Sequence, residues 1–348
     1  SEAGANLAVV AAPAGVQRSR LMSVSRELLR LIPSYKQMER ETKRLRAEAA
    51  ELRREAAALS NALATERSNS AAWTRFSPPG HFYSPLPSHE EIADAYSRGG
   101  FGPPFAAIDL NEAEQFARLE RFAEWYPEQP FPEKPTEGCR FYLENPSYGH
   151  FDAIMLYGML REARPRRVIE VGSGFSSAAM LDLNERLLGG AVQFTFIDPD
   201  MTRLRPLLRA DDRTRVTLIE QRVQEVPLEA FAALEENDVL FIDSSHVSKI
   251  GSDVNRLFFD VLPALATGVL IHIHDVSGHL DYPRDWLEEG RAWNELYLLR
   301  AFLMHNQAYR IELFSAWLWN QKTDLIRERM PQCARGGGGQ MWLRKMSR

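Results

Sequence analysis

Cysteine, long apolar runs and an excess of positive charge are all scarce in this sequence. Its 348 residues contain only two cysteines, too few for a disulfide scaffold, so we expect a reducing, cytoplasmic setting. No segment approaches the roughly 18 uninterrupted apolar residues that a membrane-spanning helix needs. The formal net charge of -5 gives no general attraction to phosphate backbones. These absences argue against a disulfide-rich module, a membrane protein and a nucleic-acid-binding protein.

Composition divides the chain into four regions. Residues 1–20 include the apolar stretch "LAVVAAPAG", which no basic residue precedes and which contains a proline, so we expect a disordered leader and not a signal peptide. Residues 21–68 are a predicted coiled-coil helix. Residues 69–144 are rich in proline, glycine and aromatics, and we interpret them as a covering segment with one short helix at 112–125. Residues 145–348 form the predicted catalytic domain.

The coiled coil is predicted from a heptad pattern. Apolar or small residues recur in alternating steps of three and four at Tyr35, Met38, Thr42, Leu45, Ala49, Leu52, Ala56, Leu59 and Leu63. In a parallel pair, Glu41 and Glu48 of one chain would face Arg46 and Arg53 of the other, whereas an antiparallel pair would bring like charges together. We therefore expect a parallel homo-oligomer, most simply a dimer, starting near Pro33 and ending at the polar stretch from Ser68. A single amphipathic helix packed on its own domain is the alternative.

The C-terminal region alternates apolar runs with helical patterns. Five runs are suited to strands, at residues 168–171, 194–197, 216–219, 239–242 and 269–273. This rhythm predicts an α/β fold with a doubly wound, mostly parallel sheet. Two more strand candidates, at 309–314 and 339–344, have no convincing helix close to the second, and favour an antiparallel, hairpin-like edge. The prediction is a seven-stranded sheet whose last strand is antiparallel.

A glycine-containing turn follows the first of these strands in "VIEVGSGFSS", residues 168–177. Gly172 and Gly174 allow a sharp turn and a close approach to a ligand at the carboxyl end of the strand. A nicotinamide fingerprint would have a third glycine where this chain has Ser177. Glu170 on this strand and Asp198 at the end of the next can accept hydrogen bonds from the hydroxyls of a ribose. The residues alone therefore predict a nucleoside-binding α/β domain.

Four segments, "VIEVGSGFSS", "FTFIDPD", "DVLFIDSSH" and "GVLIHIHDV", in this order and spacing, resemble class I S-adenosylmethionine-dependent methyltransferases. More narrowly they resemble the metal-dependent small-molecule O-methyltransferases, over roughly residues 145–348. The resemblance implies a Rossmann-like methyltransferase fold and S-adenosylmethionine as cofactor. It places Glu170, Gly172, Ser173 and Gly174 around the amino-acid part of the cofactor and Asp198 at its ribose. Val223 and Gln224 would contact the adenine, and Asp243 would also lie beside the cofactor.

The resemblance also implies a divalent metal ion held by Asp243, His274 and Asp275. The family usually has an oxygen ligand where this chain has His274, which leaves the metal open among Mg, Mn, Fe and Zn. His246 stands where the same branch has its general base, with metal ligation as its rival role. His272 should point to the same side as His274 and lie deeper.

Several other residues have simpler interpretations. Asp152 and Asp253 lie at predicted helix starts, where a carboxylate compensates the helix dipole. Tyr282 and Trp286 are candidates for the wall of an acceptor pocket, Trp293 is assigned to packing, and residues 336–339 to a flexible glycine turn.

The predicted function is methyl transfer from S-adenosylmethionine to a hydroxyl of a small molecule, such as a sugar or a natural-product scaffold. A nicotinamide-dependent oxidoreductase is the alternative enzyme, although no Tyr-x-x-x-Lys pair is visible. A coiled-coil scaffold with a vestigial nucleotide domain is the alternative without catalysis.

Overall fold

The structure is a computed structural model, and it describes residues 33–74, 76–98 and 105–347. The chain forms two compact units, Ser1–Ser84 and Pro85–Arg348, which are described separately. The predicted leader, residues 1–20, and residues 21–32 of the predicted coiled coil lie outside the described residues. No helix in the described part of the chain is long and apolar enough to cross a membrane.

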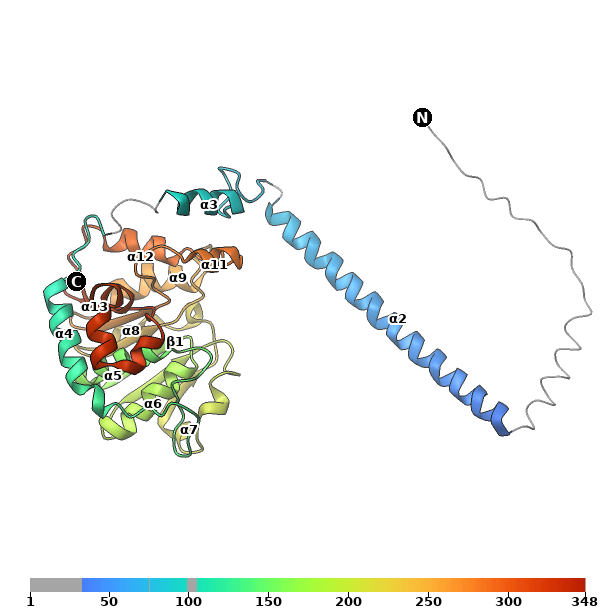
Figure 1. Ribbon diagram of the computed structural model, residues 1–348, viewed down its shortest axis with the longest axis horizontal. Helices are drawn as coiled ribbons and strands as arrows, with labels where there is room; N and C mark the ends of the chain where they lie inside the picture. The colour runs from blue at the N-terminus through green and yellow to red at the C-terminus, as the bar shows by residue number, and fades with distance from the viewer. Residues whose placement is uncertain (1–32, 75, 99–104, 348) are drawn as a thin grey trace, which may run out of the picture. The chain divides into compact units, whose positions relative to one another are not determined.

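The first unit consists mainly of the long helix α2, Pro33–Thr74 (Figure 1). Proline suits the first turn of a helix, because the missing N–H would have no partner there. The predicted end at Ser68 is wrong, since the helix continues to Thr74. The stretch after Ser68 is polar but contains neither glycine nor proline, so nothing in it breaks a helix that is already formed. Leu45, Leu52 and Leu59 of the heptad pattern are 53 to 71% exposed.

The second unit is built on a seven-stranded sheet with the order β3-β2-β1-β4-β5-β7-β6. Strands β1 to β5 are parallel, and β7 pairs antiparallel with both β5 and β6. Their bounds are Arg167–Val171 (β1), Gln193–Ile197 (β2), Val216–Ile219 (β3), Val239–Ile242 (β4), Leu270–His274 (β5), Tyr309–Phe314 (β6) and Gln340–Lys345 (β7). The predicted fold class is confirmed. The hairpin-like link is wrong, because helix α13, Ser315–Arg329, lies between β6 and β7.

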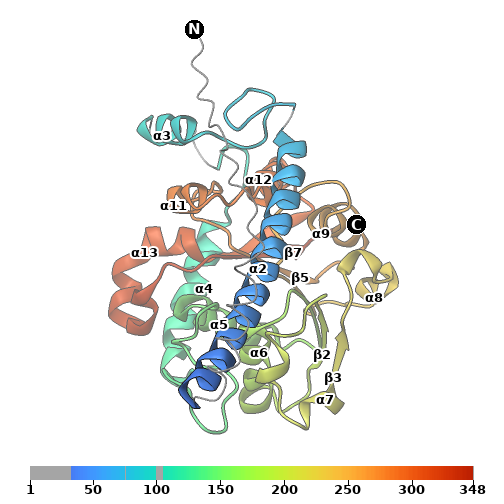
Figure 2. The same cartoon turned by 90° about the vertical axis from the view of Figure 1, so that its right-hand side faces the viewer.

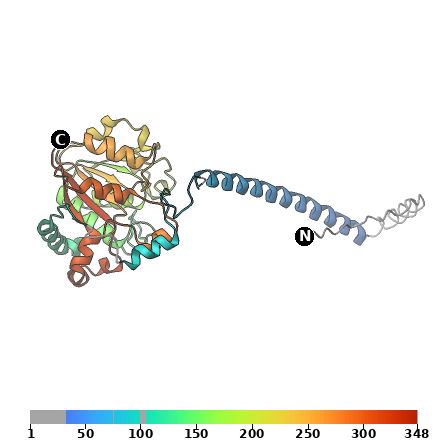
Figure 3. The same ribbon diagram turned by 90° about the horizontal axis from the view of Figure 1, so that it is seen from above.

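Helices cover both faces of the sheet (Figures 2 and 3). Helices α4 (Glu112–Trp125), α5 (His150–Ala163), α6 (Phe175–Leu187), α13 and the 3-10 turn η5 (Pro331–Arg335) form one layer. The other contains α8 (Leu228–Ala232), α9 (Asp253–Arg256), the π-helical turn η4 (Leu257–Val261) and α10 (Leu262–Ala264). The remaining elements are α3 (His89–Ser97), η1 (Tyr126–Glu128), η2 (Arg205–Leu207), α7 (Asp212–Arg215), η3 (Val223–Glu225), α11 (Arg284–Glu288) and α12 (Glu295–Leu303).

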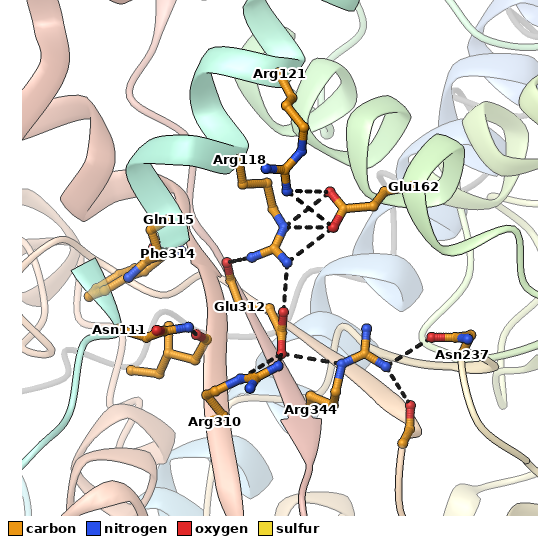
Figure 4. A network of polar contacts seen from close by, with 12 residues as sticks. Asn111, Gln115, Arg118, Arg121, Glu162, Asn237, Arg310, Glu312, Phe314 and Arg344 are labelled. Carbon is orange, nitrogen blue, oxygen red and sulfur yellow. Dashed lines mark hydrogen bonds and ion pairs between the residues drawn. The ribbon is translucent and has the colours of Figure 1, made fainter. Parts of the chain in front are cut away.

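Buried ion pairs attach the covering segment to the catalytic body. In Figure 4, the Arg118 guanidinium of α4 lies 2.7 Å from the Glu312 carboxylate of β6 and 3.1 Å from Glu162 of α5. Arg344 of β7 binds the same Glu312. Elsewhere, Arg140 of the covering segment is almost fully buried among acidic partners that include α6 and α7 residues. Because an unpaired buried charge is costly, these pairs fix the segment in place.

Candidate active site

The turn after β1 requires glycine at position 172. Gly172 has a φ of +84°, and a Cβ there would lie 1.9 Å from the backbone oxygen of Asp243. Its N–H donates to Ile197 O across the sheet at 2.9 Å. Any other residue would clash with the end of β4, so the turn joins the ends of β1, β2 and β4 closely.

Glu170 lies beneath this turn and is fully buried. Its carboxylate accepts hydrogen bonds from Ser176 Oγ, at 2.5 Å, and from Ser177 Oγ. Ser177 Oγ also accepts from Gly174 N at 3.0 Å, so the serine in place of a third glycine holds the turn together. Burial raises the pKa of Glu170 from 4.5 to about 8, although both hydroxyls oppose the shift. Glu170 does not line the cavity described next, so it supports the turn from below.

Two adjoining cavities open at the carboxyl edge of the sheet. The first, of about 730 Å³, is lined by the predicted residues Gly172, Ser173, Gly174, Asp198 and Asp243. The second, of about 450 Å³, contains Val223 and Gln224 and shares Gly172, Asp198 and Asp243 with the first.

Asp198 stands where the two cavities meet and is held by the backbone. Its two carboxylate oxygens accept from Ser173 N at 2.9 Å and from Asp200 N at 2.8 Å. Arg203 also lines the first cavity, beside Gly174. Sequence reasoning missed it, because it follows no motif.

Acidic groups and a histidine meet at the edge of the first cavity. Donor atoms of Asp243, His246 and Asp275 all lie within 4.8 Å of one another. His246 Nε2 is 3.2 Å from Asp275 Oδ2 and 3.5 Å from Asp243 Oδ1. Two carboxylates and one imidazole suit Mn, Fe or Zn, so this cluster fits a divalent ion.

The predicted metal-ligand set of Asp243, His274 and Asp275 is not the one that converges. His274 Nε2 lies 3.9 Å from Asp275 Oδ1, and His274 is not a member of the donor cluster among the described residues. As expected, His272 lies deeper on the same side of β5, with its ring stacked 5.6 Å from that of His274. The loop after β4 instead brings His246 within reach of Asp243 and Asp275.

The environment of His246 is strongly acidic. Burial lowers its pKa, but hydrogen bonds to Asp243, Asp275 and Glu295 outweigh that effect and raise the pKa to about 12. The histidine has a left-handed backbone, with a φ of +59°, and Asp275 has one of +55°. Glu295, 2.9 Å from His246 Nδ1, was missed by sequence reasoning because it lies on α12, far along the chain.

A third cavity, of about 420 Å³, lies on the other side of Asp275. Trp286, Trp319 and Asn320 line it, and it shares Ser147, His274 and Asp275 with the first cavity. Residues 337–339 of the glycine turn also line it. Trp286 is thus at a cavity wall as predicted, whereas the structure buries Tyr282.

The assignment of Trp293 to packing alone is incomplete. Trp293 lines the first cavity and contacts His246, with ring centroids 4.3 Å apart and the ring planes tilted by 42°. Asp152 and Asp253, the two carboxylates predicted at helix starts, each accept a hydrogen bond from a backbone N–H. Asp152 accepts from Gly339 N at 2.9 Å, and Asp253 accepts from Ser245 N at 2.7 Å.

Comparison with known proteins shows which type of domain contains these residues. Residues 169–276 match a family model described as "Methyltransferase domain". This range contains the glycine turn, Asp198 and the acidic cluster. This part of the chain is therefore a methyltransferase domain. The family match favours neither the nicotinamide-dependent alternative nor the non-catalytic scaffold.

The methyltransferase is also similar to individual proteins. It is 33% identical over 168 residues to an uncharacterized protein of Archaeoglobus fulgidus, covering 46% of this chain and 74% of that protein.

Solved structures are less similar in sequence. A SAH-bound methyltransferase of Podospora anserina, PaMTH1, is 15% identical, with 75% of this chain and 98% of that chain covered and a TM-score of 0.37. The O-methyltransferase TomG of Streptomyces achromogenes, in complex with SAM, is 14% identical, with 66% and 90% covered and a TM-score of 0.35.

Proposed function

We propose that this enzyme transfers the methyl group of S-adenosylmethionine to a hydroxyl oxygen of a small molecule, assisted by a divalent ion. The observation that carries the proposal is the cluster of Asp243, His246 and Asp275 at the edge of the cavity that the glycine turn forms. A divalent ion lowers the pKa of a hydroxyl and orients its oxygen. The acceptor oxygen forms a bond to the methyl carbon, and the carbon–sulfur bond breaks with its electron pair going to sulfur, which leaves S-adenosylhomocysteine. The hydroxyl proton passes to solvent water.

The two adjoining cavities together provide places for the parts of the cofactor. In this proposal the methionine part lies against Ser173 and Gly174, the ribose hydroxyls bind Asp198, and the adenine lies beside Val223 and Gln224. Both cavities share Asp198, which supports its placement between the two ends of the cofactor. Glu170 contributes by holding the turn through Ser176 and Ser177.

The acceptor is proposed to lie in the third cavity. Trp286 and Trp319 offer apolar faces, and Asn320, Ser147 and Ser277 offer hydrogen-bonding groups. Flat apolar walls with polar groups between them suit a sugar ring or a natural-product scaffold. This cavity shares Asp275 with the first, so a bound acceptor would reach the proposed metal and the methyl group together.

His246 is proposed as a metal ligand together with Asp243 and Asp275. The predicted role of general base is its rival, because an imidazole Nε2 bound to an ion cannot also accept the proton of the acceptor. The distances of 3.2 Å and 3.5 Å from Nε2 to the two carboxylates favour ligation.

Metal titration of histidine variants tests this proposal. We expect His246→Ala and Asp275→Asn to abolish high-affinity Mn²⁺ binding, measured by calorimetry, while S-adenosylhomocysteine still binds. His274→Ala is the matched control and should keep Mn²⁺ affinity within about threefold, since His274 Nε2, 3.9 Å from Asp275 Oδ1, is too far away to orient that proposed ligand through a hydrogen bond. Loss of binding in His274→Ala alone would restore the set predicted from the sequence. If methylation continues after all divalent ions are chelated, the proposed role of the metal ion is wrong.

We also propose that α2 pairs with α2 of a second copy as a parallel coiled coil. Its support is the exposure of the leucines in the heptad pattern and the complementary charges at Glu48 and Arg53.

A further inference from the structure

The loop after β4 is held by the first residues of α12, and Glu295 makes the central contact. Glu295 Oε2 lies 2.9 Å from His246 Nδ1 and also accepts from Ser244 Oγ at 2.9 Å. The Glu295 side chain is 2% exposed and that of His246 is 8% exposed. The contact is therefore shielded from water.

This contact decides which ring nitrogen of His246 faces the acidic cluster. A carboxylate accepts hydrogen bonds, so Nδ1 carries the hydrogen that it donates to Glu295. Nε2 is then the atom directed at Asp243 and Asp275, at 3.5 Å and 3.2 Å. Metal-bound histidines commonly donate their other N–H to a carboxylate in this way, which fixes the tautomer and the ring orientation.

The backbone of the loop is fixed by the same helix start. His246 O accepts from Asn294 N at 3.0 Å and from Glu295 N at 3.1 Å. Asn294 also exchanges hydrogen bonds with Ser248, accepting from its N–H and donating to its O. The Trp293 ring covers the imidazole. The position and rotation of the imidazole are thus set by three consecutive residues, Trp293, Asn294 and Glu295, at the start of α12.

A purely structural role does not explain why a glutamate occupies position 295. Its second oxygen, Oε1, is buried and has no hydrogen-bond partner within the described part of the chain. A buried polar atom without a partner costs folding free energy, so a carboxylate here needs another reason. By contrast, both oxygens of the buried Glu312 bind arginines (Figure 4).

We propose that Glu295 is a positioning residue that aims His246 Nε2 into the gap between Asp243 and Asp275. The inference rests on the proposed function, in which these three residues hold a divalent ion. Without Glu295 the imidazole can rotate and present either nitrogen.

The test compares Glu295→Ala, Glu295→Gln and the matched control Glu312→Gln in the full-length enzyme. Mn²⁺ affinity is measured by electron paramagnetic resonance. Loss of a carboxylate behind a ligating histidine lowers metal affinity about 10- to 100-fold, and we expect this for Glu295→Ala. Glu295→Gln should recover most of the affinity, because its amide oxygen can still accept from Nδ1. Glu312→Gln should leave the affinity unchanged even where it lowers the melting temperature.

A second measurement does not depend on the metal. The proton of a His246 Nδ1–H bound to a carboxylate should give a downfield resonance in the proton NMR spectrum of the metal-free enzyme, assigned by its absence in His246→Ala. It should disappear in Glu295→Ala. A retained resonance, or equal losses of Mn²⁺ affinity in all three variants, would overturn the positioning role. If the resonance behaves as expected but His246→Ala binds Mn²⁺ normally, the proposed metal site fails and the positioning of the ring stands.

Discussion

At the scale of single residues, Gly172 lets the ends of three strands approach one another. A Cβ at this position would lie 1.9 Å from Asp243 O, and the φ of +84° is itself unfavourable for alanine. We expect Gly172→Ala to lower the free energy of unfolding by about 3 kcal/mol or more, because strain and a backbone clash add together. Affinity for S-adenosylhomocysteine, measured by calorimetry, should fall as well.

Gly190→Ala is the control for backbone strain. Gly190 has a φ of +73° but nothing within 4 Å of an added Cβ. The variant should lose about 1 kcal/mol and keep its cofactor affinity. If both variants lose the same stability and affinity, the close approach at Gly172 is not what matters.

Glu170 should make stability depend on pH. Its pKa is about 8 in the folded protein against 4.5 for an ordinary glutamate. Its stabilising contribution is complete below about pH 4.5 and is lost as pH rises through 8, because only the unfolded state releases the proton in this window. Relative to Glu170→Gln, the wild type should lose up to about 1.4 kcal/mol per pH unit in urea unfolding between pH 5 and 8.

Glu312→Gln serves as the control for that measurement. Burial raises the pKa of Glu312, but Arg118, Arg310 and Arg344 together bring it below its usual value. Ionisation of Glu312 therefore changes the free energy of unfolding only below about pH 4.5, outside the measured range of pH 5 to 8. A wild type that parallels Glu170→Gln from pH 5 to 8 would show that Glu170 is ionised in the folded protein.

At the scale of elements, charge variants of α2 test whether two copies of the helix pair and whether they pair in parallel. In a parallel pair each chain's Glu48 faces the other's Arg53, so Arg53→Glu creates two repulsive contacts. With about 0.5 to 1 kcal/mol for each pair, dimer affinity in sedimentation should fall about tenfold. The double variant Glu48→Arg, Arg53→Glu should restore it.

Arg54, one position further along α2, is exposed and outside the predicted contact. Arg54→Glu should therefore leave dimer affinity unchanged. Failure of the double variant to recover would argue for an antiparallel pair or a different surface.

At the scale of the whole molecule, we expect the second unit to fold and to bind the cofactor without the first. The buried residues of the main hydrophobic core begin at Leu110, and Phe105 and Ile108, which pack against them, also belong to the second unit. We expect residues 85–348 to unfold cooperatively and to bind S-adenosylhomocysteine within about twofold of the 348-residue chain, since every residue that lines the two proposed cofactor cavities belongs to the second unit. Light scattering should report a monomer for the truncated protein and a dimer for the full chain. If the truncated protein and the full chain have the same oligomeric state, α2 does not mediate dimerisation.

Much of the catalytic body could be predicted because its signals are local. Strands β3 and β4 match their apolar runs residue for residue, β1 and β2 each begin one residue earlier than their runs, and β5 is shifted by one residue. Helix α13 was not predicted, because its residues mix tryptophan, asparagine and charged groups without a clear apolar stripe.

The site was predictable only in part. Asp243 and Asp275 are the residues that directly follow β4 and β5, so the topology of the sheet brings them together. The approach of His246 to these two carboxylates depends on a left-handed turn and on Glu295, contacts that only tertiary structure creates.

The left-handed backbone at His246 and Asp275 has an evolutionary consequence. Each such residue, when it is not glycine, raises the energy of the folded chain by about 1 to 2 kcal/mol. Glycine would remove this energetic cost at either position, but it would also remove a side chain of the proposed metal site. A laboratory selection for heat resistance alone should therefore erode the acidic cluster first, whereas a selection that also demands turnover should keep both residues and gain its stability elsewhere.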